Sequence, residues 1–194
     1  MQSVIPKIDV IIPIYKPDEK YDRLLQALKK QSIPPHHIYI IHTMTDGTQE
    51  TKESDRYAGM EQVSITNITR EQFNHGGTRN MGVSMSDAEF VLMMTQDAVP
   101  ADSHLLEELV RPFEEEEVAA TYARQLATKE VGIIEQYTRN FNYPDKEQKK
   151  TKKDLERLGI KTFFCSDVCA MYRKSVYEKM GGFGSAKWAL TRMR

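Results

Sequence analysis

The sequence predicts an α/β fold with a mostly parallel central sheet flanked by helices. Predicted strands alternate with predicted helices along the first hundred residues, and this alternation favours parallel pairing. The segment 90–94 (FVLMM) is entirely apolar, as expected for a strand that helices cover on both faces. With 194 residues and a hydrophobic fraction of 40%, the chain is expected to form a single domain over residues 1–194.

The first strand is predicted over residues 9–15 (DVIIPIY), which are β-branched and apolar and lie between prolines. An amphipathic helix is predicted over residues 19–31, because apolar side chains recur at i, i+3, i+4 and i+7. Asp18 is its expected N-cap. Further strands are expected over residues 37–42 and 62–68, and a short surface helix over residues 49–59.

The stretch 73–97 is predicted to contain a turn, a helix, a buried strand and a polar cluster. Residues 75–77 (HGG) are expected to form the turn, since glycine takes positive φ at little steric cost. Thr78 is the expected N-cap of the helix that follows. The buried strand ends in Thr95-Gln96-Asp97. A carboxylate in that position lies where open α/β sheets bind their ligands, at the carboxyl end of a central strand.

The second half of the chain is predicted to contain two more strands and two more helices. Its lysine-rich segment 146–158 (KEQKKTKKDLERL) is expected to be a solvated helix, with binding to a membrane surface or an anionic lipid-linked acceptor as the alternative. The strands are expected over residues 118–126 and 168–172, and the helices over residues 102–113 and 173–180, the last closed by Gly181-Gly182.

Composition excludes several classes of protein. The net charge of -1 provides no global field to attract nucleic acid. There is no run of 18 apolar residues that could span a membrane, and the N-terminus lacks the pattern of a secretory signal. Cys165 and Cys169, in a C-x-x-x-C spacing without nearby histidines, form a poor zinc signature. We therefore expect two reduced, buried cysteines in a cytosolic protein.

The segments FNHGGTRN (73–80) and FVLMMTQDAVP (90–100) resemble the family 2 glycosyltransferases with the GT-A fold, and within them the rhamnosyltransferase-like branch. In that family the strand ends in an Asp-x-Asp motif, whose last carboxylate holds a divalent metal on the diphosphate of a sugar nucleotide. Thr95-Gln96-Asp97 occupies these places here, with threonine instead of the first aspartate. The resemblance thus implies that Asp97 holds Mg²⁺ or Mn²⁺ and that Gln96 lies in the donor site.

The same resemblance implies residues that contact the nucleotide base. The family's first strand ends in a Pro-x-Tyr segment against the base, matched by Pro13 and Tyr15; the alternative is a core strand followed by a turn. The family also carries an aspartate after its second strand that accepts a hydrogen bond from the uracil or thymine ring N–H. Asp46 in TDGT matches it, and the alternative is a plain turn aspartate.

Arg79 matches the basic position of the family's helix near the nucleotide, and Asn80 and Gly82 complete the Arg-Asn-x-Gly pattern. Arginine suits phosphate and base edges, because its planar guanidinium donates several hydrogen bonds in a fixed geometry. The alternative for Arg79 is an ion-paired surface residue. His75 is a further candidate for facing the donor, with a structural role in the turn as its alternative.

The resemblance covers residues 5–183 and includes Gly-Gly-Phe at its end. It implies that the strand over 118–126 lies beside the metal-site strand. Soon after Gly-Gly-Phe the family carries a Glu-Asp pair, one member of which is the general base of an inverting transfer. No Asp or Glu follows Glu178, and the tail 184–194 is atypical, so we expect the acceptor-side part to be lacking. Asp167 is then the fallback candidate for the base.

The implied function is transfer of a sugar from a nucleotide-diphospho-sugar, with dTDP-rhamnose as the implied donor, to a carbohydrate or lipid-linked glycan. The implied location is the cytoplasm, with peripheral association at the inner face of the membrane as an open possibility. One alternative is a sugar-nucleotide-binding module that is catalytically incomplete, because the acidic pair is absent. Another is a nucleotidyltransferase, which would need a basic glycine-rich loop where the chain has Tyr15-Lys16-Pro17.

Overall fold

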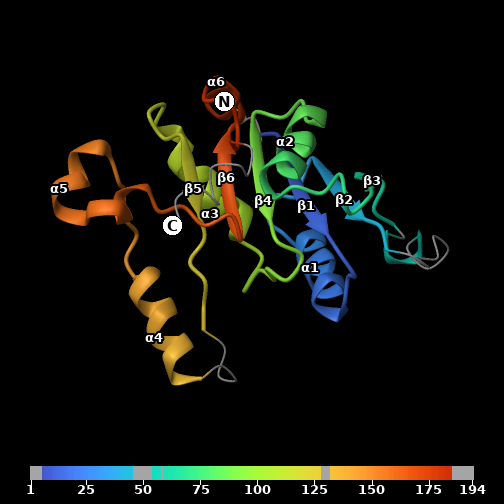
Figure 1. Cartoon of the computed structure of the whole chain (residues 1–194), viewed down its shortest axis with the longest axis horizontal. Helices are drawn as coiled ribbons and strands as arrows, with labels where there is room; N and C mark the ends of the chain where they lie inside the picture. Colours follow the sequence, from blue (N-terminus) through green and yellow to red (C-terminus); the bar gives the residue numbers. More distant parts are fainter. Residues whose placement is uncertain (1–5, 46–53, 58, 128–131, 185–194) are drawn as a thin grey trace.

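The protein is described by a computed structural model that covers residues 6–45, 54–57, 59–127 and 132–184. Within these ranges the chain forms a six-stranded sheet in the order β3-β2-β1-β4-β6-β5 (Figure 1). The first four strands along the chain are parallel, whereas β6 runs antiparallel to both β4 and β5. This confirms the predicted mostly parallel sheet. The strands are β1 (Ile8–Ile14), β2 (His37–Thr43), β3 (Val63–Ile68), β4 (Phe90–Met94), β5 (Ala120–Tyr122) and β6 (Cys169–Arg173).

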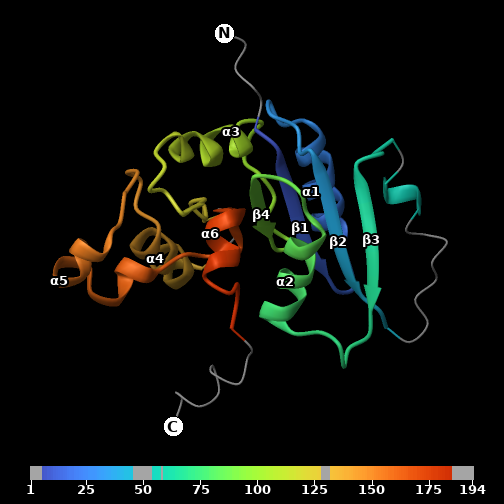
Figure 2. The same ribbon diagram turned by 90° about the horizontal axis from the view of Figure 1, so that it is seen from above.

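Helices cover both faces of the sheet, as Figure 2 shows from above. Helices α1 (Glu19–Lys29) and α3 (Leu105–Val110) pack on one face, in a core that includes Val10, Ile12 and Leu92. Helices α2 (His75–Met85) and α6 (Lys174–Lys179) lie on the other, where Ile11 and Met93 meet Val83 and Tyr177. Side chains of β1 and β4 therefore alternate between two buried faces, which explains why β4 is apolar throughout and β1 is apolar except at Asp9.

Helix α1 forms as its sequence predicts. The Asp18 side chain accepts hydrogen bonds from the backbone N–H groups of Lys20 and Tyr21, at 3.0 and 3.4 Å. These bonds satisfy two of the donors that a helix start leaves unpaired. The apolar face is fully buried against the sheet and comprises Tyr21, Leu24, Leu25 and Leu28.

The start of α2 differs from the prediction. Asn74 is its N-cap, accepting from the N–H groups of Gly76 and Gly77 at 3.1 and 2.9 Å. His75, Gly76 and Gly77 are thus the first helical turn and not a turn with positive φ. Thr78, the predicted cap, lies inside the helix and accepts from the Asn74 N–H at 3.2 Å. The cap was misplaced because Asn74 and Thr78 bond reciprocally and both are good capping residues.

The predicted strand over residues 118–126 shortens to β5, and its predicted place beside the metal-site strand is wrong. β6 pairs with β4 in the register Met94↔Cys169, and β5 pairs only with β6. The free edge of β4 is therefore occupied by an antiparallel strand from the end of the chain. A strand of three residues carries too few side chains for its neighbour to be read from sequence.

The lysine-rich segment is not one helix. It contains a 3₁₀ turn (Lys152–Asp154) and a four-residue helix α5 (Leu155–Leu158), followed by a second 3₁₀ turn (Gly159–Phe163). A separate helix α4 (Ile133–Asn142), which the sequence reading did not identify, precedes it. Among residues 49–59 the described helical part is a 3₁₀ turn (Ser54–Tyr57). In the part of the chain that the structure covers, no helix is long and apolar enough to cross a bilayer.

Both cysteines are free. Cys169 is buried in β6, and burial raises the pKa of its thiol to about 12. Cys165 is partly buried, and desolvation raises its thiol pKa as well. Neither thiol therefore has the exposed, acidic character of a reactive cysteine.

Candidate functional site

The candidate site lies at the carboxyl edge of the sheet, where β1 and β4 separate. The pairing of β1 with β4 ends at Ile11↔Met93, whereas β1 stays paired with β2 as far as Ile14. Pro13 contributes to this ending because it has no N–H to donate to a neighbouring strand. Strands β2 and β3 follow β1 on one side of it in the sheet, and β4 then lies on its other side, so the direction in which strands are added reverses at β1. Such a switch point is where open α/β sheets form a ligand crevice.

Gln96 links the two separated strands. Its side-chain Oε1 accepts from the Tyr15 N–H at 2.7 Å, and its Nε2 donates to the Tyr15 carbonyl at 3.2 Å. The amide thereby replaces the missing backbone ladder and fixes the end of β1. The next residue, Lys16, has a φ of 47°, a costly value for a side chain of its size. Gln96 thus supports Tyr15, and its contact with a nucleotide stays a prediction.

Replacing Gln96 with methionine, which has similar length and no amide, should lower the free energy of unfolding by about 1–2 kcal/mol, because two hydrogen bonds are lost. Urea denaturation would measure it. Gln26→Met on exposed α1 surface is the matched control and should be nearly neutral. Equal stability of the two variants would show that the link between Gln96 and Tyr15 contributes nothing.

Tyr15 presents an exposed aromatic ring with two cations beside it. The residue is 39% exposed, the Arg70 guanidinium carbon lies 6.0 Å from the centroid of its ring, and the Lys16 ammonium lies 5.4 Å from that centroid. Arg70 follows β3 by two residues and so reaches the same edge of the sheet. Sequence reasoning missed Arg70, although a basic residue directly after a predicted parallel strand is a usable signal.

Helix α2 starts at this edge, so the positive end of its dipole faces the crevice. His75 is exposed in the first turn, and its ring contacts that of Phe73 edge-on at 5.0 Å between centroids. Arg79 donates from Nη1 to the His75 carbonyl at 2.8 Å, while its Nε is buried without a hydrogen-bond partner in the described structure. The described residues give Arg79 no ion pair, which argues against its ion-paired alternative.

The other two residues of the Arg-Asn-x-Gly pattern have packing roles. Asn80 accepts from the Phe183 N–H at 3.0 Å and from the Tyr177 hydroxyl at 2.5 Å, and it donates to the Phe183 carbonyl at 3.0 Å. It therefore holds the Gly-Gly-Phe segment against α2. Gly82 lies directly on β1, where an added Cβ would come 2.4 Å from the Ile11 Cγ2.

Thr95-Gln96-Asp97 places two oxygen groups directly after the end of β4. Asp97 is exposed, and its carboxylate forms no hydrogen bond or ion pair with any described residue. The Thr95 hydroxyl is buried and lacks a hydrogen-bond partner among the described residues. One carboxylate and one hydroxyl suit a hard cation such as Mg²⁺, which keeps several waters and takes further oxygens from substrate phosphates. The residues present therefore fit the predicted metal.

Asp167 lies at the same edge, in the turn just before β6. The Thr95 N–H donates to the Val168 carbonyl at 3.0 Å, which sets the segment before β6 beside the end of β4. The Asp167 carboxylate accepts from the Tyr172 hydroxyl at 2.6 Å. Burial, followed by the nearby Cys165 and Asp167, raises the pKa of Tyr172 far above its usual range, so this hydroxyl stays a donor. Asp46, the predicted base contact, lies outside the described residues.

A second acidic group lies at the opposite edge of the sheet. Asp9 is fully buried near the start of β1, 2.9 Å from His36 Nδ1, and it accepts from the Ser86 hydroxyl at 2.6 Å. With Asp87, these side chains place metal-ligand atoms within 4.8 Å of one another. Asp9 and Tyr15 are six positions apart along extended chain, or about 20 Å. This group is therefore distinct from the Asp97 position.

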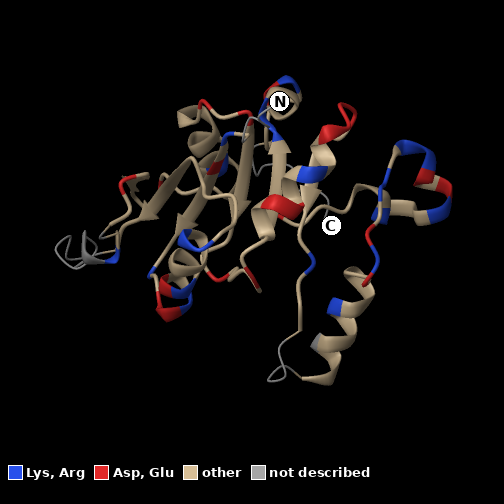
Figure 3. Ribbon diagram, turned by 180° about the vertical axis from the view of Figure 1, so that it is seen from behind, with Lys and Arg blue, Asp and Glu red and all other residues tan. Residues whose placement is uncertain are grey.

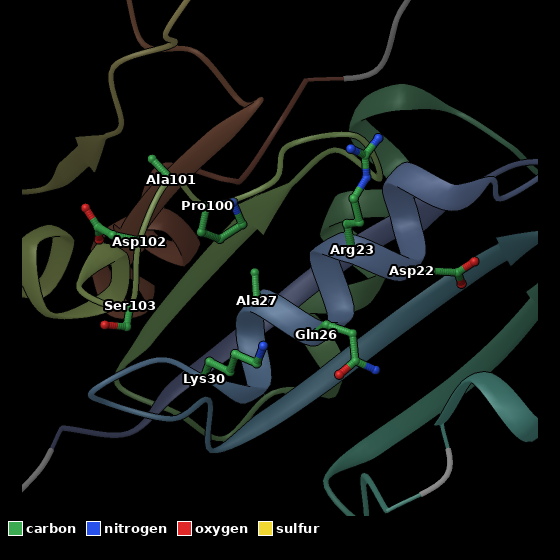
Figure 4. A pocket seen from close by; sticks show the side chains of 9 residues that line it. All are labelled: Asp22, Arg23, Gln26, Ala27, Lys30, Pro100, Ala101, Asp102 and Ser103. Atoms are coloured by element: carbon green, nitrogen blue, oxygen red, sulfur yellow. The ribbon is translucent and has the colours of Figure 1, made fainter. Parts of the chain in front are cut away.

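A groove in the described structure lies elsewhere. It measures about 460 Å³ and lies between α1 and the segment after Asp97, as Figure 4 shows. The Arg23 and Lys30 side chains line it, together with Asp22 and residues 100–103. None of the predicted donor residues takes part in it. The candidate site therefore rests on strand topology and on polar atoms that lack partners among the described residues.

Known proteins resemble the chain over most of its length. The model of the family described as "Glycosyl transferase family 2" matches residues 9–181. The O-antigen chain rhamnosyltransferase RfbN of Salmonella typhimurium is 40% identical over 178 residues, covering 91% of this chain and 55% of that protein. WbaN of Salmonella anatum, another O-antigen chain rhamnosyltransferase, is 35% identical over 92% of this chain and 56% of its own. The chain thus spans about half the length of these curated relatives.

Solved structures share the fold. The mannosyltransferase PcManGT from Pyrobaculum calidifontis, solved with GDP-Man and Mn2+, superposes with a TM-score of 0.65 at 16% identity, over 94% of this chain and 48% of that one. TarS residues 1–349 from S. aureus give a TM-score of 0.67 at 16% identity, over 90% and 49%. These matches confirm the predicted GT-A fold.

Proposed function

The chain belongs to glycosyl transferase family 2, and we propose that it binds a nucleotide-diphospho-sugar at the crevice between β1 and β4 for transfer of the sugar to a glycan. The observation that carries this proposal is the exposed Asp97 carboxylate, unpaired among the described residues, at the carboxyl end of β4, on the edge of the sheet where α2 begins. A carboxylate left without a protein partner, on an edge that also carries a helix N-terminus, suits a phosphate ligand that arrives with a cation.

The donor would lie across the end of β1. The nucleobase would pack on the exposed Tyr15 ring, because base–aromatic stacking is favourable and Gln96 holds that residue in place. Arg70 and Lys16, the two cations beside the ring, would face the negatively charged diphosphate. Arg79 would add a third cation, through the buried Nε that lacks a partner in the described structure. Asp46 and His75 stay candidates for further donor contacts.

Chemistry requires that charge on the departing diphosphate be stabilised. When bound at Asp97, Mg²⁺ or Mn²⁺ would neutralise part of that charge. The bond between the anomeric carbon and the diphosphate oxygen breaks, and its electron pair leaves with the diphosphate. An acceptor hydroxyl attacks that carbon from the opposite face, so the configuration inverts, and a carboxylate takes the hydroxyl proton. Asp167 is the candidate for this base among the described residues.

Rhamnose is the sugar we propose, because both curated relatives are named as rhamnosyltransferases. The proposed acceptor is a polysaccharide or lipid-linked glycan, consistent with the O-antigen chains in those names. A thermal-shift panel would test the donor: with Mn²⁺ present, dTDP-rhamnose should raise the Tm more than UDP-, GDP- and other dTDP-sugars. A larger rise with another sugar nucleotide would refute the choice of rhamnose.

The runner-up is a module that binds the sugar nucleotide without transferring it. It is favoured by the hydrogen bond from Tyr172 to Asp167, because this bond already occupies a carboxylate oxygen that would have to accept the proton of an acceptor hydroxyl. This version predicts Mn²⁺-dependent donor binding and no transfer to any glycan acceptor. Measurable sugar transfer by the 194-residue chain would exclude it.

A further inference from the structure

Apolar side chains are unusually exposed on one part of the molecule. Of the thirteen large hydrophobic side chains exposed in the described chain, eight lie between residues 126 and 163. Four of them are on α4, where Ile133, Ile134, Tyr137 and Phe141 are 85%, 83%, 71% and 59% exposed. Their spacing of i, i+1, i+4 and i+8 places them on one face of the helix. An apolar face this exposed marks an interaction surface.

The position of α4 is fixed at its carboxyl-terminal end. Tyr143, just after the helix, packs edge-on against Tyr122 and Phe164, and its hydroxyl accepts from Gln125 at 2.6 Å. Arg139 donates to the Leu126 carbonyl at 3.3 Å. The helix is thus anchored beside β5 while its apolar face turns to solvent. In Figure 1 it extends from the edge of the sheet toward which β1 and β4 point, the edge that carries the candidate site.

The same segment is basic. Residues 132–163 contain eight Lys and Arg against five Asp and Glu, in a chain whose net charge is -1. Figure 3 shows Lys and Arg interspersed with Asp and Glu around α5, next to the mostly uncharged ribbon of α4. Within the described structure, Lys152, Lys153 and Lys161 form no ion pair, and the Lys161 ammonium lies 3.2 Å from the centroid of the Phe141 ring.

We propose that α4 and the basic segment after it form a docking surface for an anionic lipid bilayer, with Ile133, Ile134, Tyr137 and Phe141 inserted among the acyl chains. An apolar helix face with lysines at its margin is the pattern of an interfacial helix. A protein partner would fit less well, because lysine is depleted from protein interfaces. A second copy of this chain would set two segments of the same excess charge against each other. The inference does not depend on the proposed sugar transfer.

Flotation with lipid vesicles tests the proposal. The 194-residue chain should float with vesicles of phosphatidylglycerol and phosphatidylethanolamine, should float much less with phosphatidylcholine alone, and should be released by high salt. The double variant Ile133→Ser with Ile134→Ser should bind about tenfold more weakly or worse, since two large apolar side chains no longer insert. Met180→Ser is the matched control, because Met180 is 78% exposed at the end of α6.

A second pair of variants tests how much the lysine charges contribute to vesicle binding. Lys152→Glu with Lys153→Glu should weaken binding to the anionic vesicles about tenfold or more, whereas Lys7→Glu with Lys179→Glu, at the amino edge of the sheet, should not. All of these positions are exposed, so folding should be preserved, which circular dichroism would verify. Absence of flotation, or flotation unaffected by the isoleucine variant, would overturn the proposal. Dimerisation that the isoleucine variant abolishes would also overturn it, since a second copy would then cover α4.

Discussion

Replacing Asp97 with alanine should remove the Mn²⁺-dependent part of donor binding and leave the fold intact. The side chain is exposed and unpaired among the described residues, so its removal should change the free energy of unfolding by less than about 0.5 kcal/mol. A ligand at about 100 times its Kd stabilises by about 2.7 kcal/mol, or roughly 5–10 °C in Tm for a chain of this size. We expect dTDP-rhamnose with Mn²⁺ to give this shift to the native chain and little of it to the variant.

The control for this experiment is Asp87→Ala. Asp87 is also an exposed carboxylate, but it belongs to the Asp9–His36–Asp87 group at the amino edge of the sheet. Its removal should leave the Mn²⁺-dependent shift unchanged. If the shift instead disappeared with Asp87→Ala and persisted with Asp97→Ala, the cation would lie at the amino edge. The assignment of Asp97, and with it the orientation of the donor, would then be wrong.

The fold was predictable because its central elements carry strong local signals. The apolar run of β4 and the leucine face of α1 each specify burial within a few residues of sequence. The order of the remaining strands carried no such signal. β5 has three residues, and its place depends on β6, which arrives from about fifty residues further along the chain. Only long-range packing decides which of the two later strands, β5 or β6, pairs with the free side of β4.

The candidate site was predictable in position but not in its internal contacts. Parallel strands bring their carboxyl ends to one edge, so Tyr15 and Asp97 could be placed together from sequence. The bonds of Gln96 to Tyr15 and of Asn80 to Phe183 join residues 81 and 103 positions apart. No local pattern encodes such pairs. A family motif can therefore combine a residue that is a candidate for ligand binding with residues that pack the fold. In the Arg-Asn-x-Gly pattern, Arg79 is the candidate, whereas Asn80 and Gly82 have packing roles.

The second large effect is expected from replacing Gly82, the glycine of the Arg-Asn-x-Gly pattern, and concerns the stability of the fold. Gly82→Ala should lower the free energy of unfolding by about 2–3 kcal/mol, or roughly 4–12 °C in Tm. The new Cβ would meet Ile11 Cγ2 at 2.4 Å and Cγ1 at 3.2 Å, and Ile11 is fully buried in β1. A side chain enclosed in this way cannot rotate aside, so α2 would have to lift from the sheet. The gain in helix propensity from glycine to alanine, about 1 kcal/mol, is too small to compensate.

Gly77→Ala is the matched control, since it makes the same chemical change in the same helix. A Cβ there meets nothing closer than 3.4 Å, so propensity should dominate and the variant should be neutral or slightly more stable. Ile11→Ala should restore part of the loss when combined with Gly82→Ala, because it removes both clashing carbons. A double-mutant cycle by urea denaturation would measure this coupling. If the effects of the two substitutions on the free energy of unfolding were simply additive, close contact between α2 and β1 could not be the reason for glycine at position 82. The helix would then not lie as close to the strand as described.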